Sequence, residues 1–210
     1  MPASVPRFRL VLTGVGAMNS PRFAPAGLMV EHDRTRVVID GGRGAAPADA
    51  PLTAWLVTDQ RAELIQEIRS EAAARGLAPR VATVREGGLD VVPMRVVHTS
   101  RPTYGYLIRA EGWRIAWAPE FLRFPDWADG VDLMLADAAG WERPIRFSGG
   151  VGGHAAAVDV AIEARRRGVR RLVFAHIGRP TIRASDAGLR PPFGTLGRDG
   201  QAFYPRRWRR

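Results

Sequence analysis

The sequence contains no cysteine and no lysine, and only four of its 210 residues are histidines. The lack of cysteine excludes disulfide bonds, thiolate metal ligands and a cysteine nucleophile. Any metal ion in this protein would therefore have to be held by histidine, aspartate or glutamate. The four histidines are His32, His98, His154 and His176, so the search for a functional site narrows to few places.

Long apolar runs are also lacking. None approaches the roughly 18 residues needed to cross a membrane, and residues 1–7 lack the apolar core of a signal peptide. We therefore expect a cytoplasmic protein that has no membrane partner. A length of 210 residues, 46% of them hydrophobic and 25% charged, allows one sizeable domain and demands no second. The whole chain, 1–210, is predicted to be a single domain.

The positive charge comes from arginine alone, and the net charge is +10. The arginines are spread along the chain, with clusters at Arg165–Arg167 and Arg206–Arg210. Two interpretations fit this pattern. One is a solvated basic surface, and the other is an anionic partner, either a small phosphorylated substrate or nucleic acid. A homo-oligomer is also compatible with this composition.

The stretch Thr53–Leu64 organises the chain, because an apolar run stops there and polar side chains begin. Trp55–Val57 reads as a short strand, and Ile65, Ile68 and Ala72 then fall on one stripe at helical spacing. Loops at the carboxyl ends of strands often gather functional side chains. Asp59, Arg61 and Glu63 are therefore site candidates. In the alternative interpretation, Asp59 is only the N-cap of the helix and Glu63 is a first-turn acid.

The remaining elements predict an α/β sandwich, with sheets inside and helices outside. Four runs between residues 80 and 118 indicate an antiparallel sheet. A second helix is predicted over 155–167, opened by His154, and residues 181–210 are a predicted C-terminal covering segment. The predicted strands are 8–14, 27–31, 36–39, 55–57, 80–85, 89–98, 104–109, 113–118, 131–136, 171–175 and a short one near 202–204.

Polar residues also close several of the other predicted strands. An acid followed by two glycines, Asp40-Gly41-Gly42, suits a backbone that bends tightly near a site. His154 follows the glycine-rich stretch 148–153. His32 falls in a predicted hairpin turn and is given no role. The other candidates at strand ends are His98, Glu120, Asp137 and His176.

The order of these motifs resembles the metallo-β-lactamase superfamily, particularly its ribonuclease Z-like and phosphodiesterase-like branch. Thr13–Gly16 is similar to that branch's opening Gly-Thr-Gly loop, and Val38–Gly42 to its strand ending in Asp-x-Gly. Asp137 falls in a segment similar to His-Glu-Ala, His154 in one similar to Gly-His-Ser, and His176 at the strand that delivers the last ligand. The resemblance covers nearly the whole chain and implies an αβ/βα sandwich of two mixed sheets with helices outside.

The resemblance breaks at the family's His-x-His-x-Asp-His motif. By position, Asp59 replaces the first histidine, Arg61 the second, Glu63 the aspartate and Leu64 the third histidine, and Glu120 replaces an aspartate that bridges two metals. Leucine cannot coordinate a metal, and the permanent charge of arginine repels a divalent ion. A normal di-zinc centre is therefore not expected.

Three outcomes remain for the site. In the first, Asp59, His98, Glu120 and His176 hold one divalent metal, Zn, Mn or Fe, that lowers the pKa of a bound water toward about 7. His154 and Asp59 would then be the catalytic residues, with His154 as proton donor or oxyanion binder. Asp40 would not bind the metal itself but would orient one of the metal ligands. This outcome implies a hydrolase acting on a phosphodiester or related ester.

In the second outcome, Arg61 itself supplies the positive charge and pairs with Glu63 and Glu120. The protein would then be a non-catalytic, degenerate member of the fold that binds an anionic ligand or nucleic acid without a metal. A third outcome is a different chemistry in the same cleft. Each histidine also has an ordinary structural use, as a partly buried residue at a strand end or at a helix N-terminus.

Overall fold

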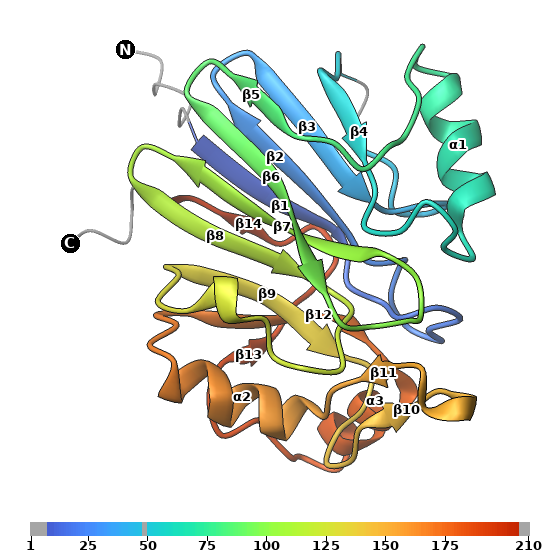
Figure 1. The fold of residues 1–210 in the computed structure, drawn as a ribbon, viewed down its shortest axis with the longest axis vertical. Coiled ribbons are helices and arrows are strands. Elements are labelled where there is room, and N and C mark those ends of the chain that lie inside the picture. The colour runs from blue at the N-terminus through green and yellow to red at the C-terminus, as the bar shows by residue number, and fades with distance from the viewer. Residues whose placement is uncertain (1–7, 48–49, 206–210) are drawn as a thin grey trace.

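The structure is a computed structural model that describes residues 8–47 and 50–205. Two larger sheets lie face to face, and three α-helices lie outside them in the described part of the chain (Figure 1). Residues 1–7, where no signal peptide is predicted, and the arginine cluster at 206–210 lie outside the described residues.

The first sheet has the strand order β14-β1-β2-β3-β4. Strands β1 to β3 pair antiparallel, and β4 joins β3 in parallel. Burial alternates along β1, because the two-residue period of a strand sends successive side chains to opposite faces, whereas Val37, Val38 and Ile39 of β3 are all buried. The strands are β1 (Phe8–Gly14), β2 (Gly27–His32), β3 (Thr35–Asp40), β4 (Ala54–Leu56) and β14 (Ala202–Phe203).

The second sheet has the order β13-β12-β9-β8-β7-β6-β5. Its β5 to β8 part is antiparallel, as the sequence predicts, whereas β8, β9, β12 and β13 run parallel. Every residue of β9 and β12 is buried, which is typical of parallel strands covered on both faces. The strands are β5 (Val84–Glu86), β6 (Leu89–Val96), β7 (Thr103–Ala110), β8 (Trp113–Ala118), β9 (Leu133–Ala138), β12 (Leu172–Ile177) and β13 (Thr195–Leu196).

Two hydrophobic clusters explain this layering. Val37 and Ile39 of β3 point into the main core between the sheets, where they join Trp117 of the second sheet. Val38, on the opposite face of β3, packs with Ile65 in a second cluster under the first helix. The first sheet is thus covered by the main core on one face and by a helix on the other.

The helices cover the outer faces. Helix α1 (Ile65–Ala73) buries Ile65, Ile68 and Ala72, the stripe that the sequence predicts. Helix α2 (Ala157–Arg166) packs on β9 and β12, and helix α3 (Arg179–Asp186) follows β12. Two short 3-10 turns, η1 (Asp126–Ala128) and η2 (Ser148–Gly150), complete the helical elements. No helix in the described residues is long and apolar enough to cross a membrane.

Several local predictions are wrong. In place of the predicted strand 80–85 there is only β5 (Val84–Glu86). The segment before His154, where no strand was predicted, contains η2 and a two-stranded ribbon, β10 (Ile145–Arg146) and β11 (Gly153–His154). His154 therefore lies in a strand and does not open a helix, because α2 begins three residues later, at Ala157. His32 is a buried strand residue and not part of a turn.

The covering segment 181–210 also contains structure that was not predicted. Helix α3 occupies the beginning of this segment. Pro180 lies in the first turn of the helix, where the missing N–H of proline costs nothing. The short strand predicted near 202–204 is present as β14.

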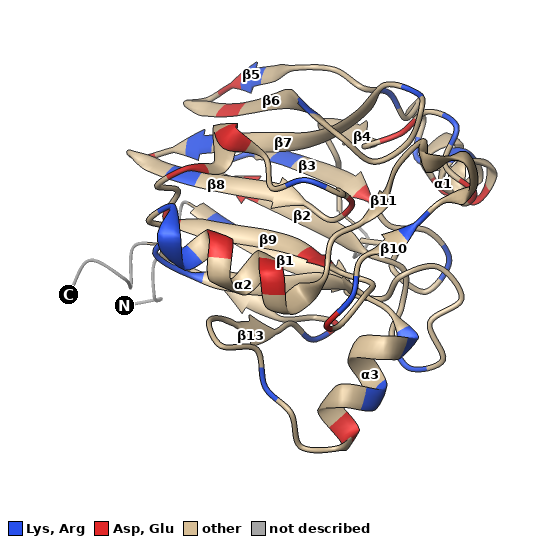
Figure 2. Ribbon diagram, turned by 60° about the horizontal axis from the view of Figure 1, so that its bottom comes forward, with Lys and Arg blue, Asp and Glu red and all other residues tan. Residues whose placement is uncertain are grey.

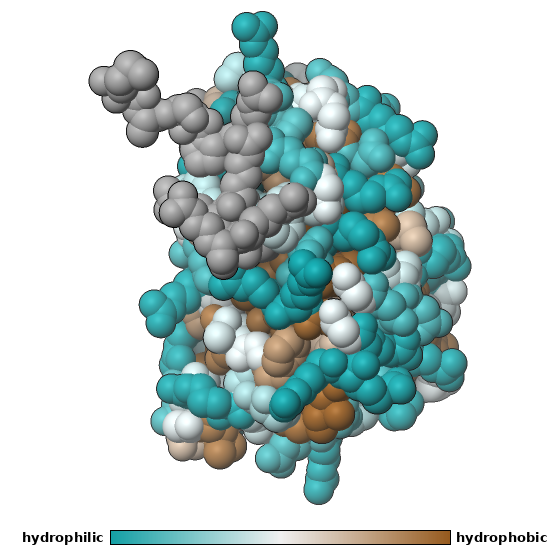
Figure 3. All heavy atoms as spheres, turned by 90° about the vertical axis from the view of Figure 1, so that its left-hand side faces the viewer, coloured by the Kyte–Doolittle hydropathy of each residue, from teal (hydrophilic) through white to brown (hydrophobic). Residues whose placement is uncertain are grey.

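Basic and acidic residues are interspersed along the ribbon (Figure 2). Part of the cluster Arg165–Arg167 has partners within the protein. Arg167 Nη1 lies 2.8 Å from Asp126 Oδ1 and 3.1 Å from Asp129 Oδ1, and Arg166 Nη2 lies 2.7 Å from Glu163 Oε2. Much of the positive charge in this arginine cluster is therefore balanced locally. Polar residues cover most of the face shown in Figure 3.

Candidate functional site

Seven of the nine predicted site residues line one cavity of about 410 Å³ at the carboxyl ends of the central strands. Asp59, Arg61 and Glu63 enter it from the loop after β4, and the other four enter from the second-sheet side. Those four are His98 after β6, Glu120 after β8, His154 in β11 and His176 in β12. Strands fix the base of each loop while the side chains converge.

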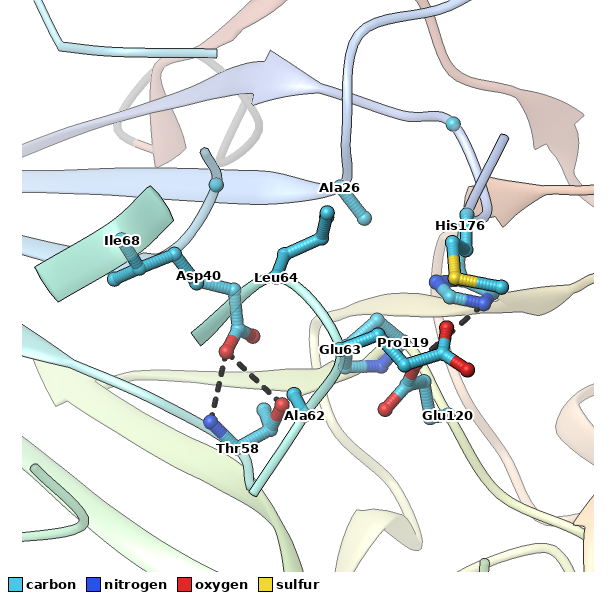
Figure 4. A pocket seen from close by; sticks show the side chains of 13 residues that line it. Ala26, Asp40, Thr58, Ala62, Glu63, Leu64, Ile68, Pro119, Glu120 and His176 are labelled. Carbon is cyan, nitrogen blue, oxygen red and sulfur yellow. Dashed lines mark hydrogen bonds and ion pairs between the residues drawn. The ribbon is translucent and has the colours of Figure 1, made fainter. Parts of the chain in front are cut away.

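His98, Glu120 and His176 form the centre of this group. Glu120 Oε2 lies 3.6 Å from His98 Nε2, and Glu120 Oε1 lies 3.6 Å from His176 Nε2. One carboxylate therefore stands between two imidazoles from separate strands (Figure 4 shows the Glu120–His176 pair). Both histidines are buried, and burial lowers the pKa of each imidazole because the charged form loses its hydration.

His154 is held by a buried acid. Its Nδ1 makes a 2.8 Å hydrogen bond to Asp137 Oδ2, and the Asp137 side chain has no exposed surface. Burial opposes a charge on His154, but attraction and hydrogen bonding by Asp137 outweigh it, so the pKa of His154 is raised. Asp137 also accepts the backbone N–H groups of Phe121 at 3.0 Å and Ala139 at 2.9 Å. The carboxylate is thereby fixed from three sides.

The ring of His154 packs against the rings of both His98 and His176. The rings of His154 and His176 lie 5.1 Å apart and 20° from parallel, and the His98 ring centroid lies 4.6 Å from that of His154. The Phe147 ring packs edge-on against His98 and His154. Because Nδ1 of His154 is engaged by Asp137, Nε2 is the nitrogen that remains for a ligand in the cavity.

Unusual backbone geometry supports this arrangement. His176 has a φ of 68°, a left-handed conformation that is uncommon outside glycine and that often marks functional sites. Gly152 packs so closely on the backbone of His98 that an added Cβ would stand 1.9 Å from the His98 carbonyl oxygen. The next residue, Gly153, donates its N–H to that oxygen at 2.8 Å, and its own carbonyl lies 3.0 Å from His98 Nδ1. The glycine-rich loop is thus shaped to hold His98.

Asp40 lies beside the main cavity, in a smaller one of about 70 Å³ that it shares with Glu120 and His176 (Figure 4). Its carboxylate accepts hydrogen bonds from Thr58 N at 2.8 Å, Thr58 Oγ1 at 2.9 Å and Trp117 Nε1 at 2.9 Å. Burial raises the pKa of Asp40 to about 7, although these donors oppose the shift. Asp40 therefore fixes the residue before Asp59, and none of its hydrogen bonds reaches a predicted metal ligand.

Two predictions were made for the loop after β4: that Asp59 is the N-cap of the following helix, and that Arg61 pairs with Glu63 and Glu120. Asp59 Oδ1 accepts the N–H of Arg61 at 2.8 Å, so Asp59 caps its own turn, while Leu64 is the N-cap of α1. The prediction that Asp59 caps the helix is wrong. The predicted pairing of Arg61 with Glu63 and Glu120 is also wrong, since no ion pair joins these residues in the described structure. Arg61 and Glu63 are exposed side chains at the mouth of the cavity.

The donors predicted for a single metal are only partly assembled. Two imidazole nitrogens and a carboxylate, the ligand types that Zn, Mn and Fe accept, meet around Glu120. Yet the described residues contain no group of three or more histidine, aspartate or glutamate side chains that could hold a metal ion. The side chains as arranged do not fit a metal centre, and the four-ligand set Asp59, His98, Glu120 and His176 stays a prediction.

The cavity includes residues that the sequence did not single out, among them Thr99, Ser100, Arg101 and Phe147. The first three directly follow His98, and a polar loop after a strand-end histidine was the available signal. The position of Phe147 depends on the β10–β11 ribbon, which the sequence did not predict. The pairing of His154 with Asp137, 17 residues apart in the chain, was likewise not predicted.

No protein-family model and no curated protein matches this sequence. Solved structures do. The metallo-β-lactamase fold protein YhfI from Bacillus subtilis matches with a TM-score of 0.73 and 12% identity, covering 93% of this chain and 98% of that one. A diphosphatase of the PhnP family matches with a TM-score of 0.71 and 17% identity over 93% of this chain and 96% of that one.

Zn²⁺-bound PqqB from Methylobacterium extorquens has a TM-score of 0.69 and 16% identity, covering 93% of this chain and 99% of that one. At these identities the likeness establishes the fold and leaves the reaction open. The chain has the metallo-β-lactamase fold, and the fold predicted from the order of motifs is confirmed.

Proposed function

We propose that this protein of metallo-β-lactamase fold is a hydrolase of a phosphodiester or related ester, with His154 as its proton donor. The observation that carries the proposal is the 2.8 Å hydrogen bond from His154 to the buried Asp137, made at the wall of a cavity that also contains His98, Glu120 and His176. A buried carboxylate on one nitrogen of an imidazole fixes the ring and leaves the other nitrogen for proton transfer.

The remaining groups have complementary places. Glu120 lies between two histidines and is the acceptor best placed to take a proton from water. In the proposed reaction, water gives a proton to Glu120 while its oxygen bonds to the phosphorus or carbonyl carbon. The bond to the leaving oxygen breaks, and His154 gives its proton to that oxygen. A positioned acid or base of this kind typically contributes about 10²–10⁴ in rate.

A small anionic substrate is supported by Arg61 and Arg101, which line the cavity and are exposed. Arginine binds phosphate and carboxylate through paired N–H groups. Among the structural neighbours, the PhnP-family protein is a diphosphatase, a reaction of that protein that motivates including phosphate esters in the test.

A metal-dependent form of the same hydrolase is a second candidate. Its support is that two histidine nitrogens lie 3.6 Å from the oxygens of Glu120, and it requires these side chains to rearrange around the ion. His98, Glu120 and His176, with Asp59, would hold the single metal, and such an ion supplies an activated water when bound. Elemental mass spectrometry of the purified protein tests this candidate. About one equivalent of Zn, Mn or Fe that returns after chelation supports it, and no uptake contradicts it.

The test of the main proposal is turnover of bis(4-nitrophenyl) phosphate and of 4-nitrophenyl carboxylic esters, with and without added divalent metal. His154→Gln is expected to lose about 100-fold or more of the rate. The same substitution at a remote histidine, His32→Gln, is the control and should retain the rate, provided that circular dichroism shows both variants folded. No turnover under any condition would contradict the proposal and would indicate a non-catalytic binder of the fold. A fully active His154→Gln would contradict the role of His154 as proton donor.

A further inference from the structure

Another cavity, of about 450 Å³, adjoins the 410 Å³ cavity that His154 lines. The 410 Å³ cavity is called the first cavity below, and the 450 Å³ cavity the second. The two share Asp59, Arg61 and Arg101, which therefore form the boundary between them. The second cavity lies over the exposed side of the loop after β4 and the loop before β7, and Gln60 and Tyr104 contribute to its wall. A ligand bound in the first cavity could continue over this boundary into the second.

Charge is distributed unevenly between the two cavities. Glu63 and Glu120 line only the first, whereas the second has a single acid, Asp59, against the two boundary arginines. One oxygen of Asp59 is already engaged by the backbone N–H of Arg61 at 2.8 Å. In the described structure the guanidinium groups of Arg61 and Arg101 make neither an ion pair nor a hydrogen bond. An anion is therefore attracted to the boundary and toward the second cavity, away from Glu120.

The second cavity also offers an apolar wall. Val81, Pro102 and Tyr104 line it, and the Tyr104 ring lies 5.4 Å from the guanidinium carbon of Arg95. This cation–π contact fixes the aromatic ring in place. Arg61 and Arg101, whose guanidinium groups make no ion pair in the described structure, lie beside this aromatic and apolar wall. The combination is suited to a ligand that carries both a phosphate and a planar ring.

We infer that the second cavity is a subsite for a nucleoside phosphate, whose phosphate binds Arg61 and Arg101 and whose ring lies against Tyr104. The inference rests on the proposed function and names its substrate class: an ester of a nucleoside phosphate, with the ester in the first cavity. The phosphate at the boundary carries the ester bond that is hydrolysed, and the second cavity holds the nucleoside, which does not react.

Isothermal titration calorimetry at low salt tests this inference, with adenosine 5′-monophosphate, inorganic phosphate and adenosine as probes. The nucleotide is expected to bind at least about tenfold more tightly than either fragment, because both parts of the subsite are used. Arg101→Ala should weaken nucleotide binding about tenfold or more, the size expected for a hydrogen-bonded charge pair. Tyr104→Leu should weaken the nucleotide but leave inorganic phosphate unchanged.

The matched control is Arg34→Ala, an exposed arginine in the turn between β2 and β3 that lines neither cavity. Equal losses in Arg34→Ala and Arg101→Ala would overturn the inference, because binding would then follow net charge alone. Nucleotide binding no tighter than that of phosphate would also overturn it.

The two proposals fail in different ways. Turnover that depends on His154, together with no nucleotide binding, overturns the subsite alone. Nucleotide binding that depends on Arg101, together with no turnover of any ester, overturns the hydrolase alone.

Discussion

Replacing Asp137 by alanine is predicted to destabilise the protein strongly. The side chain is fully buried and accepts three hydrogen bonds, from Phe121 N, Ala139 N and His154 Nδ1. Alanine would leave two buried backbone N–H groups without an acceptor, at about 1–3 kcal/mol each. The expected loss is therefore about 2–6 kcal/mol, a large part of a typical stability of about 5–15 kcal/mol.

The loss should depend on pH with a defined sign. The pKa of His154 is raised in the folded protein, so its contribution is fully present below the pKa of the unfolded chain and disappears as pH rises through the folded value. Asp137→Ala removes the cause of the raised pKa. The difference between wild type and variant should therefore be larger at acidic than at alkaline pH.

Urea denaturation followed by tryptophan fluorescence measures this loss, with the m-value as a check on two-state behaviour. Asp137→Asn is the matched control. It keeps one acceptor oxygen and nearly the same volume, so it should cost less than alanine. A loss below about 1 kcal/mol for Asp137→Ala would refute the reasoning, because two orphaned N–H groups cannot cost so little.

Two further predictions concern the walls of the site. Gly152→Ala should prevent stable folding or displace His98, because its Cβ would stand 1.9 Å from the His98 carbonyl oxygen. The control, Gly150→Ala, meets nothing within 4 Å and should cost only about 1 kcal/mol of left-handed strain. Thermal denaturation compares the two variants, and similar melting temperatures would contradict the close packing of Gly152. The raised pKa of Asp40 predicts stability that is present below its ordinary value near 3.8 and is lost as pH rises through about 7. A ¹³C NMR titration that placed this carboxyl near 4 would contradict it.

Much of the fold could be predicted because hydrophobic period and turn residues determine it locally. The stripe Ile65, Ile68 and Ala72 is buried under α1 as expected, and the four runs between 80 and 118 form an antiparallel sheet. Helix α3 was not predicted, because its sequence is short and polar, follows Gly178 and contains Pro180. Pro180 in the first turn was the signal that could have indicated it.

The site could be predicted only in part, for a physical reason. Strand ends identify which side chains face the cleft, and seven of the nine candidates do line one cavity. Which of them pair depends on loop conformations that no local pattern encodes. His154 reaches Asp137 through the β10–β11 ribbon, and Arg61 turns to the cavity mouth instead of pairing with Glu63.

The most direct test of the account is the pair of rates of wild type and His154→Gln with the most reactive ester of the panel, in the metal condition that supports the highest turnover. The account predicts that wild type hydrolyses the ester and that His154→Gln is slower by about 100-fold or more while its melting temperature and its nucleotide binding are retained. An unchanged rate in a folded His154→Gln, or a wild type without any turnover, would contradict it.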